Sequence, residues 1–184
     1  MGRLGGFQQG QFDSLCGLYS ITNAVSVVAK PHRFTQAKSQ ALLHHLFADL
    51  NSRSKLLSVL QEGAYPHEIS KLLSVTQGWL FEQHNIKLNR FKPFHKKKDV
   101  SLPDIFDTVL THIAQTNGVA IIGFEGRIDH WTVVEGMTEK RLMLRDSDGR
   151  RHIERKHCRL ACDPIDEHFY MIAPAHVFLL SLLP

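Results

Sequence analysis

The sequence predicts an α+β fold, in which helices come first along the chain and an antiparallel sheet follows. Apolar residues recur with helical spacing through most of the first half, where Pro66 suits a first helical turn. After Gly118 the pattern changes to short apolar or alternating runs, which are typical of strands. Hydrophobic residues make up 43% of the 184 positions, enough for one full-sized core. We therefore expect a single domain over residues 1–184.

Start and stop signals set the bounds of the predicted elements. Thr35, Ser52 and Ser101 are suitable N-caps, and Asn117 followed by Gly118 is a suitable helix end. The predicted helices are 14–29, 35–50, 52–61, 66–77 and 103–115. The predicted strands are 86–91, 119–124, 130–135, 141–145, 168–172 and 176–182.

Composition narrows the class of protein. The longest apolar runs are too short and too interrupted to span a bilayer, and the first residues lack the apolar core of a signal peptide. Three cysteines are too few for a disulfide scaffold and suit a reducing compartment. We expect a cytoplasmic protein, or a secreted effector whose export signal has no recognisable form. The oligomeric state is left open.

The net charge of +4 includes one dense basic run, Lys96-Lys97-Lys98. This run indicates either a solvated loop, which we favour, or a contact for an acidic partner or nucleic acid. Basic and aromatic residues do not interleave in a pattern that indicates nucleic-acid binding, so no nucleic-acid partner is expected.

One cysteine lies where a helix is expected to begin. Ser14 is a suitable N-cap, which would place Cys16 in the first turn of the helix. The free N–H groups and the positive dipole end of a helix favour the thiolate, the form of cysteine that attacks a carbonyl carbon. Gly17 beside it either permits close approach of another chain or eases packing. Cys16 is therefore the candidate nucleophile.

A base and an acid are expected on a later β-hairpin. If Glu135 pairs with Arg141 across a five-residue loop, His130 lies directly opposite Asp146. Facing residues of antiparallel strands have Cβ atoms about 4.5–5.5 Å apart, which suits a hydrogen bond between carboxylate and imidazole. Asp148 shares the same face and is the second choice for the acid.

Each of these residue types has a task in thiol chemistry. His130 would take the proton of Cys16 and later protonate the leaving group, while Asp146 would fix the tautomer of the ring. Trp131 is either a packing residue or a shield for the His130–Asp146 pair. Cys158 and Cys162 have no typical zinc spacing and indicate core thiols, so neither a metal nor a cofactor is expected.

A tetrahedral intermediate also needs hydrogen-bond donors for its oxyanion. The backbone N–H of Cys16 supplies one, and a side-chain amide from upstream would be the natural second. Gln11 fits this role best, and Gln9 and Gln8 stay open as alternatives.

Together these residues resemble the papain-like cysteine proteases, which have a glutamine, then a cysteine at a helix start, then histidine and an acid or amide on later strands. Gln11 lies five residues before Cys16, which is the spacing of Josephin-domain deubiquitinases. Most papain-type enzymes and the leader-processing peptidases have the glutamine six residues before, where this chain has Gly10. The segments 11–16 and 130–134 are similar to the Josephin patterns Gln-x-x-Ser-Leu-Cys and His-Trp-x-x-Val.

The resemblance implies a papain-like fold with Cys16 as nucleophile, His130 as base, Asp146 as orienter and Gln11 as oxyanion donor. Josephin domains usually carry Asn where this chain has Asp146. The pair Cys16-Gly17 is more similar to leader-processing peptidases and bacterial papain-like effectors. The matched windows are short, so the resemblance supports the fold and the catalytic set more than any ubiquitin substrate.

The sequence therefore predicts a cysteine hydrolase that cleaves an amide or isopeptide bond of a peptide or protein through an acyl-enzyme intermediate. A protein glutamine deamidase or a transferase would use the same residues. A non-catalytic module that binds a peptide or protein is the alternative from another class. The identity of the substrate is left open.

Overall fold

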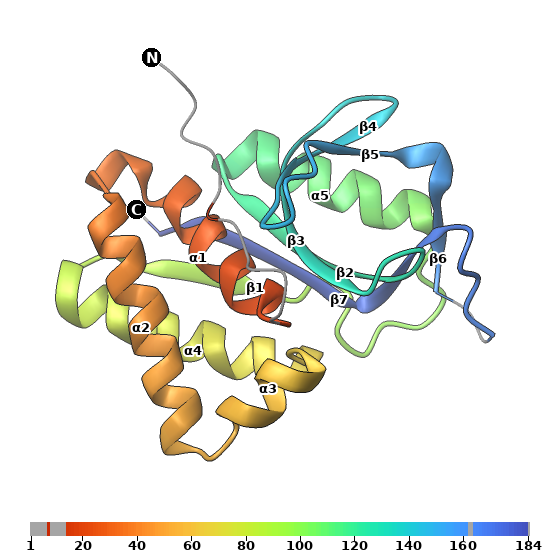
Figure 1. The fold of residues 1–184 in the computed structure, drawn as a ribbon. Helices are drawn as coiled ribbons and strands as arrows, with labels where there is room; N and C mark the ends of the chain where they lie inside the picture. Colours follow the sequence, from red (N-terminus) through yellow and green to blue (C-terminus); the bar gives the residue numbers. More distant parts are fainter. Residues whose placement is uncertain (1–6, 8–13, 162–163, 184) are drawn as a thin grey trace.

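Helices and one mainly antiparallel sheet make up the structure, a computed structural model that describes residues 7, 14–161 and 164–183. The α+β class predicted from the sequence is confirmed (Figure 1). The helices are α1 (Cys16–Val28), α2 (Gln36–Ser52), α3 (Leu56–Glu62), α4 (Pro66–His84) and α5 (Leu102–Thr116), with 3-10 turns η1 (Lys30–His32) and η2 (Arg155–His157). The strands are β1 (Leu88–Phe91), β2 (Val119–Gly126), β3 (His130–Met137), β4 (Arg141–Arg145), β5 (His152–Glu154), β6 (Cys158–Leu160) and β7 (Tyr170–Leu182).

The sheet has the strand order β1-β7-β2-β3-β4-β5, and its neighbours along this path are antiparallel. The short β6 pairs with β7 in parallel. Helix α1 packs against β2, β3 and β7, with α2 and α4 behind it, while α5 packs against the same three strands (Figure 1). The helices therefore lie on both sides of the sheet, with most of them on one side.

Alternation along β2 divides the core into two clusters. Val119 and Ile121 belong to the cluster that includes α1, α2 and α4. Ala120, Ile122 and Phe124 point the other way, into the cluster beneath α5. Successive side chains of a strand face opposite sides, so a continuous apolar run is what a strand covered on both faces requires.

Local capping signals predicted several helix ends correctly. The side chain of Thr35 accepts a hydrogen bond from the Lys38 N–H at the start of α2, and Ser101 forms a reciprocal capping box with Asp104 at the start of α5. The cap predicted at Ser52 is wrong, because α2 continues to this residue and the hydroxyl of Ser52 donates to the Asp49 carbonyl. Helix α4 also continues past its predicted end, to His84.

The two last predicted strands are one strand, β7, with an irregularity in its middle. Ile122 pairs with Val177 and Phe124 pairs with Ile172, so residues 173–176 lie opposite the single residue Gly123. Pro174 lies in this bulge, where its missing N–H costs no ladder hydrogen bond. The bulge bends β7 at the point where His176 reaches the cleft described below.

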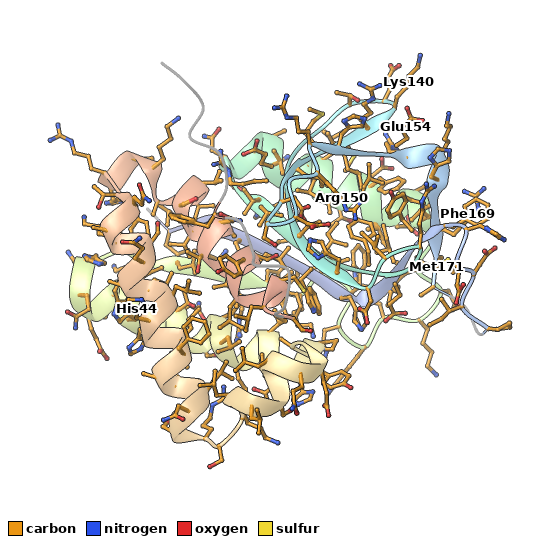
Figure 2. All side chains as sticks on the ribbon, in the orientation of Figure 1. His44, Lys140, Arg150, Glu154, Phe169 and Met171 are labelled. Atoms are coloured by element: carbon orange, nitrogen blue, oxygen red, sulfur yellow. The ribbon has the colours of Figure 1, made fainter. Side chains whose placement is uncertain are left out.

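The exposure of the basic run agrees with the solvated loop that we favoured from the sequence. Lys96-Lys97-Lys98 lies in an exposed loop between β1 and α5. His44 is exposed on α2 and Lys140 is exposed at the turn between β3 and β4 (Figure 2). None of the helices in the described part of the chain is long and apolar enough to cross a membrane.

Gly17 is a close-packing position, which decides between the two roles expected for it. A Cβ atom built there would lie 2.6 Å from Ile69 Cδ1 and 3.0 Å from the Ala64 Cβ, so α1 and the start of α4 could not keep their distance. We predict that Gly17→Ala lowers the free energy of unfolding by about 1–3 kcal/mol, measured by urea denaturation.

Gly78 provides the matched control for that substitution. It is also a helical glycine, but nothing lies within 4 Å of the Cβ that alanine would add. Gly78→Ala should stabilise the protein by about 0.5–1 kcal/mol, because it removes a glycine from a helix interior without any clash. Equal effects of the two substitutions would contradict the close packing at Gly17.

Candidate active site

Cys16 is the first residue of α1 and is only 7% exposed. Its predicted place in the first helical turn is confirmed, but the predicted cap is wrong. Leu15 occupies the N-cap position and provides no side-chain cap, whereas the Ser14 hydroxyl donates to the carbonyl of Gln61 at 3.5 Å. The first N–H groups of a helix have no partner inside the helix, so the positive end of α1 lies at the sulfur.

His130 and Asp146 form a hydrogen-bonded pair beside this cysteine. His130 Nε2 lies 2.5 Å from Asp146 Oδ1, and the two side chains are 11% and 0% exposed. The other carboxylate oxygen accepts the backbone N–H groups of Asp148 at 3.3 Å and Arg150 at 3.2 Å. The turn after β4 therefore holds the Asp146 carboxylate in place, and the carboxylate in turn orients the His130 ring.

These contacts explain why an acid rather than an amide occupies position 146. The His130 ring lies against one oxygen of Asp146, and two backbone N–H groups donate to the other. Carboxylate oxygens only accept, whereas an amide has one oxygen and one NH₂ group. An amide could not accept on both sides, so this turn requires the carboxylate.

The register predicted for the hairpin is wrong, although its parity is right. The observed pairs are Val133 with Arg145, Val134 with Leu144, Gly136 with Met143 and Met137 with Leu142. The strands extend closer to the turn than expected, because Thr138 closes a short loop by donating its N–H to the Arg141 carbonyl at 2.8 Å.

The offset is two residues at the two pairs nearer His130, which keeps the predicted faces there, and an irregularity between Val134 and Gly136 makes it three residues toward the turn. Continuing the observed register by one pair puts Asp146 opposite Thr132, which makes His130 its diagonal neighbour. Diagonal neighbours on one face lie within reach of long side chains. The contact between His130 and Asp146 is therefore present, but by a different geometry from the one predicted.

The His130 ring also interacts with the side chain of Cys16, which lines the same cleft. Burial opposes a charged ring, but the hydrogen bond with Asp146, the interaction with Cys16 and the charges of both outweigh it and raise the pKa of His130 to about 9. Burial likewise works against the Asp146 carboxylate, yet the contact with His130 holds the pKa of Asp146 below its usual range. The two shifts agree on an imidazolium paired with a carboxylate at neutral pH.

The ring nitrogen left for the sulfur is Nδ1, because Nε2 is engaged by Asp146. The backbone also contacts the sulfur, since the N–H of Trp131 lies 3.5 Å from Cys16 Sγ and donates to it. The Trp131 N–H is thus a donor to the Cys16 sulfur, and Nδ1 of the protonated ring is the donor that His130 has left to offer it.

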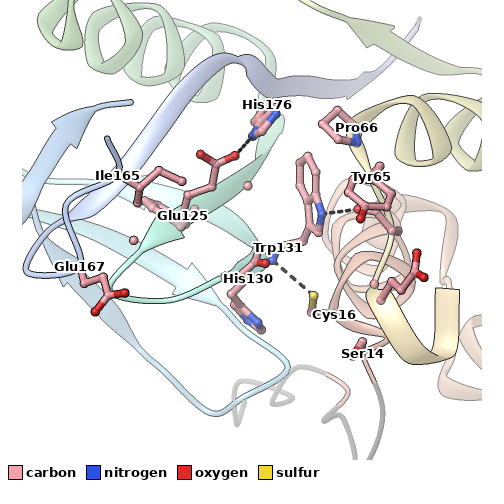
Figure 3. A pocket seen from close by; sticks show the side chains of 17 residues that line it. Ser14, Cys16, Tyr65, Pro66, Glu125, His130, Trp131, Ile165, Glu167 and His176 are labelled. Atoms are coloured by element: carbon pink, nitrogen blue, oxygen red, sulfur yellow. Dashed lines mark hydrogen bonds and ion pairs between the residues drawn. The ribbon is translucent and has the colours of Figure 1, made fainter. Parts of the chain in front are cut away.

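A cleft of about 610 Å³ contains the cysteine and the histidine. One wall comes from the start of α1 and the segment between α3 and α4, and the other comes from β2, β3 and the bulge of β7. Figure 3 shows Cys16, His130 and Trp131 where these two walls meet. The size is that of a site for a small molecule or for a few residues of a peptide.

Trp131 connects the two walls and does not shield the His130–Asp146 pair. Its indole N–H donates to the Ala64 carbonyl at 2.7 Å, and its ring lies over Gly123, where an added Cβ would come within 2.9 Å of ring carbons. Trp131 follows His130 directly in β3, so its side chain points to the other side of the strand, into the core with α1. It is a packing residue that sets the width of the cleft.

The other residues predicted from the sequence have different outcomes. Gln11, Gln9 and Gln8 lie outside the described residues, as does Cys162. Asp148, the second choice for the acid, has its carboxylate 3.0 Å from Arg150. Cys158 is fully buried beneath α5, and burial raises its pKa to about 12, which fits a core thiol.

The sequence reasoning missed the second histidine of the cleft. His176 lies in the β7 bulge, with its Nδ1 3.3 Å from Glu125 Oε1 and its ring 5.6 Å from that of Trp131 (Figure 3). Pro174 was the available signal, because a proline inside a strand pattern indicates a bulge or an edge. Nothing in the sequence pattern indicated which residue the bulge would turn into the cleft.

Comparisons with protein-family models, with curated proteins and with solved structures found no match for this chain. Its function therefore has to follow from the chemistry of the cleft. The contacts among Cys16, His130 and Asp146 are the part of the molecule that carries most of that chemistry.

The pKa of His130 leads to a prediction about stability. The value is about 9 in the folded chain, against about 6.5 for an unfolded histidine, so folding binds the proton more tightly. The contribution is complete below the unfolded value and is lost as the pH rises through the folded value. We predict that the stability advantage over His130→Gln shrinks by roughly 1–3 kcal/mol from about pH 6 to about pH 10.

Urea denaturation of both proteins across this pH range measures the advantage directly. Taking the difference between the two proteins removes the titration of groups that they share. An advantage that stays constant with pH, or grows as the solution becomes alkaline, would contradict the imidazolium–carboxylate pair.

Proposed function

We propose that this protein is a papain-like cysteine hydrolase that cleaves an amide or isopeptide bond of a peptide or protein. The observation that supports this most is the chain of contacts from Asp146 through His130 to Cys16, at a cleft between helices and sheet. The nucleophile at a helix start and the base and acid on and after strands agree with the arrangement that the sequence resemblance implies.

In the proposed reaction the Cys16 thiolate attacks the carbonyl carbon of the scissile amide, its proton being held on Nδ1 of His130. The tetrahedral intermediate collapses as the carbon–nitrogen bond breaks, and the departing amine takes the proton from His130. A thioester to Cys16 is left. Water then attacks the thioester while His130 accepts a proton, which releases the acid product and restores the thiol.

Asp146 has a defined task in these steps. Its contact with Nε2 leaves Nδ1 facing the sulfur throughout, and its charge stabilises the imidazolium that each step passes through. The backbone N–H groups of Asp148 and Arg150 keep the carboxylate from turning away. Burial of all these groups strengthens their interaction, because little water competes.

The oxyanion needs donors on the other side of the reacting carbon. We assign one to the backbone N–H of Cys16, at the first position of α1, and the other to the side-chain amide of Gln11. The five-residue spacing to Cys16 supports the choice of Gln11.

A protein glutamine deamidase or a transferase shares every step as far as the thioester. The deamidase differs in taking a side-chain amide, and the transferase differs in using an amine in place of water. A non-catalytic binding module is disfavoured, because binding alone does not require a buried acid, a histidine and a thiol in contact.

Mass spectrometry of peptide and protein mixtures incubated with the enzyme tests the proposal. Shortened chains indicate hydrolysis of the backbone or of an isopeptide bond, and a gain of about one dalton at glutamine indicates the deamidase. Both changes must be absent with Cys16→Ala. The binding module would be favoured if no substrate changed in mass and if the unmodified protein and Cys16→Ala bound peptides equally well.

A further inference from the structure

The charge of the cleft differs from that of the whole chain. The chain has 22 Lys and Arg residues against 18 Asp and Glu residues. The residues that line the cleft nevertheless include four carboxylates and neither Lys nor Arg: Glu62, Glu125, Asp129 and Glu167. The imidazolium of His130 also lines the cleft, but the buried Asp146 carboxylate offsets its charge. A concave site in which one sign of charge predominates attracts ligands of the opposite sign.

The carboxylates come from both walls of the cleft. Glu62 is the last residue of α3, while Glu125 lies in β2 and Asp129 in the turn between β2 and β3. Glu167 lies in the segment that leads into β7, on the side of Figure 3 opposite Cys16. A chain lying in the cleft would pass between carboxylates, whichever wall it followed.

Within the described residues, these charges have no permanent cation as a partner. Glu125 pairs with His176, and burial lowers the pKa of His176 against the opposing effect of Glu125, so this ring is neutral at pH 7. The other three carboxylates, Glu62, Asp129 and Glu167, are all exposed. No Lys or Arg of the described chain forms an ion pair with them. Their charge is available to a ligand.

Two exposed apolar side chains flank the same cleft. Tyr65 is 55% exposed at the start of α4, and Ile165 is 52% exposed on the opposite wall (Figure 3). Large exposed apolar residues at the rim of a site indicate contact with a partner rather than with water. A small inorganic or organic cation would leave both unused, whereas a peptide carries apolar and charged groups together.

We propose that the substrate is a basic peptide segment, with Lys or Arg and an apolar side chain on the residues that flank the scissile amide. The positive side chain pairs with the cleft carboxylates, and the apolar one packs against Tyr65 or Ile165. That the segment is cleaved rests on the proposed function. The preference for positive charge is a property of the cleft and is measurable without turnover.

Matched peptide libraries test the preference. Two sets of nine-residue, internally quenched peptides differ only in having Arg or citrulline at one fixed position, and citrulline keeps the shape of Arg without its charge. We expect kcat/KM to be about tenfold higher for the Arg set at one or more positions. The ratio should fall as salt is raised, because salt screens exposed charges.

Variants of the cleft connect the preference to particular carboxylates. Glu167→Gln and Asp129→Asn should each reduce the ratio of the Arg rate to the citrulline rate by about threefold to fivefold, whatever their effect on the citrulline rate. Glu139→Gln is the control, since this residue is exposed at the turn between β3 and β4, outside the cleft. Equal rates for Arg and citrulline peptides at every position would overturn the inference.

Binding to Cys16→Ala separates this inference from the proposed function. Fluorescence anisotropy of the same peptides, labelled with fluorescein, reports affinity without cleavage. Tighter binding of Arg than citrulline peptides, without cleavage by the unmodified protein, supports the charge preference and rejects the hydrolase. Cleavage with no charge preference in either assay rejects the basic substrate and leaves the hydrolase standing.

Discussion

Replacing Cys16 with alanine is expected to reduce hydrolysis by roughly 10⁴-fold to 10⁶-fold, the largest effect that any substitution in this chain should have. The thioester cannot form without the sulfur, and the remaining groups can only assist a direct attack by water. Cys16 is buried and its sulfur accepts the Trp131 N–H, so a modest loss of stability should accompany the loss of rate. Initial rates on the best peptide from the libraries give kcat/KM, and circular dichroism verifies the fold.

Cys158→Ala is the matched control for this substitution. Cys158 is also buried, but it packs in the cluster beneath α5 and does not line the cleft. Its removal should cost stability through a small cavity and leave kcat/KM within a few-fold of the original. Retained hydrolysis in Cys16→Ala, or its loss in folded Cys158→Ala, would contradict the assignment of the nucleophile.

Replacing His130 with alanine is expected to reduce hydrolysis by roughly 10³-fold or more, the second largest effect. In the proposed reaction, this side chain holds the proton of the thiol and returns it to the leaving amine. It also leaves the Asp146 carboxylate buried without its main partner, so some loss of stability should accompany the loss of rate. Steady-state kinetics and urea denaturation separate the two effects.

Chemical rescue sharpens this second test. The cavity left by the ring opens toward the cleft, so added imidazole should restore part of the activity of His130→Ala. His152→Ala, at an exposed position in β5, should behave like the original protein. Full activity without His130 would rule out its role as the base.

The helix start and the faces of the strands were predictable because they depend on short-range patterns. Cys16 lies in a first turn since the apolar spacing after it fixes where α1 runs. The contact between His130 and Asp146 was predictable because it requires only that both side chains lie on the same face of the hairpin. A shift of two residues keeps every side chain on its face, whereas a shift of one would have separated them.

Features that depend on tertiary packing were not predictable. Ser14 has a good capping side chain, but contacts with α3 draw it to the carbonyl of Gln61, and Leu15 takes its place. The bulge of β7 brings His176 beside Glu125, a pairing between residues about fifty positions apart that no local pattern contains. The indole of Trp131 reaches Ala64 only because Gly123, on the neighbouring strand, has no side chain.

The most direct test of the account is the rate at which iodoacetamide alkylates each cysteine at pH 7, followed by peptide mass mapping. Protonated His130 and the Trp131 N–H both face the Cys16 sulfur, whereas Cys158 is buried in a core. We predict that Cys16 is alkylated far ahead of Cys158 and Cys162, and that His130→Ala slows its alkylation at least about tenfold. Equal labelling of the three cysteines, or a Cys16 rate unchanged by His130→Ala, would contradict a thiol activated by its histidine.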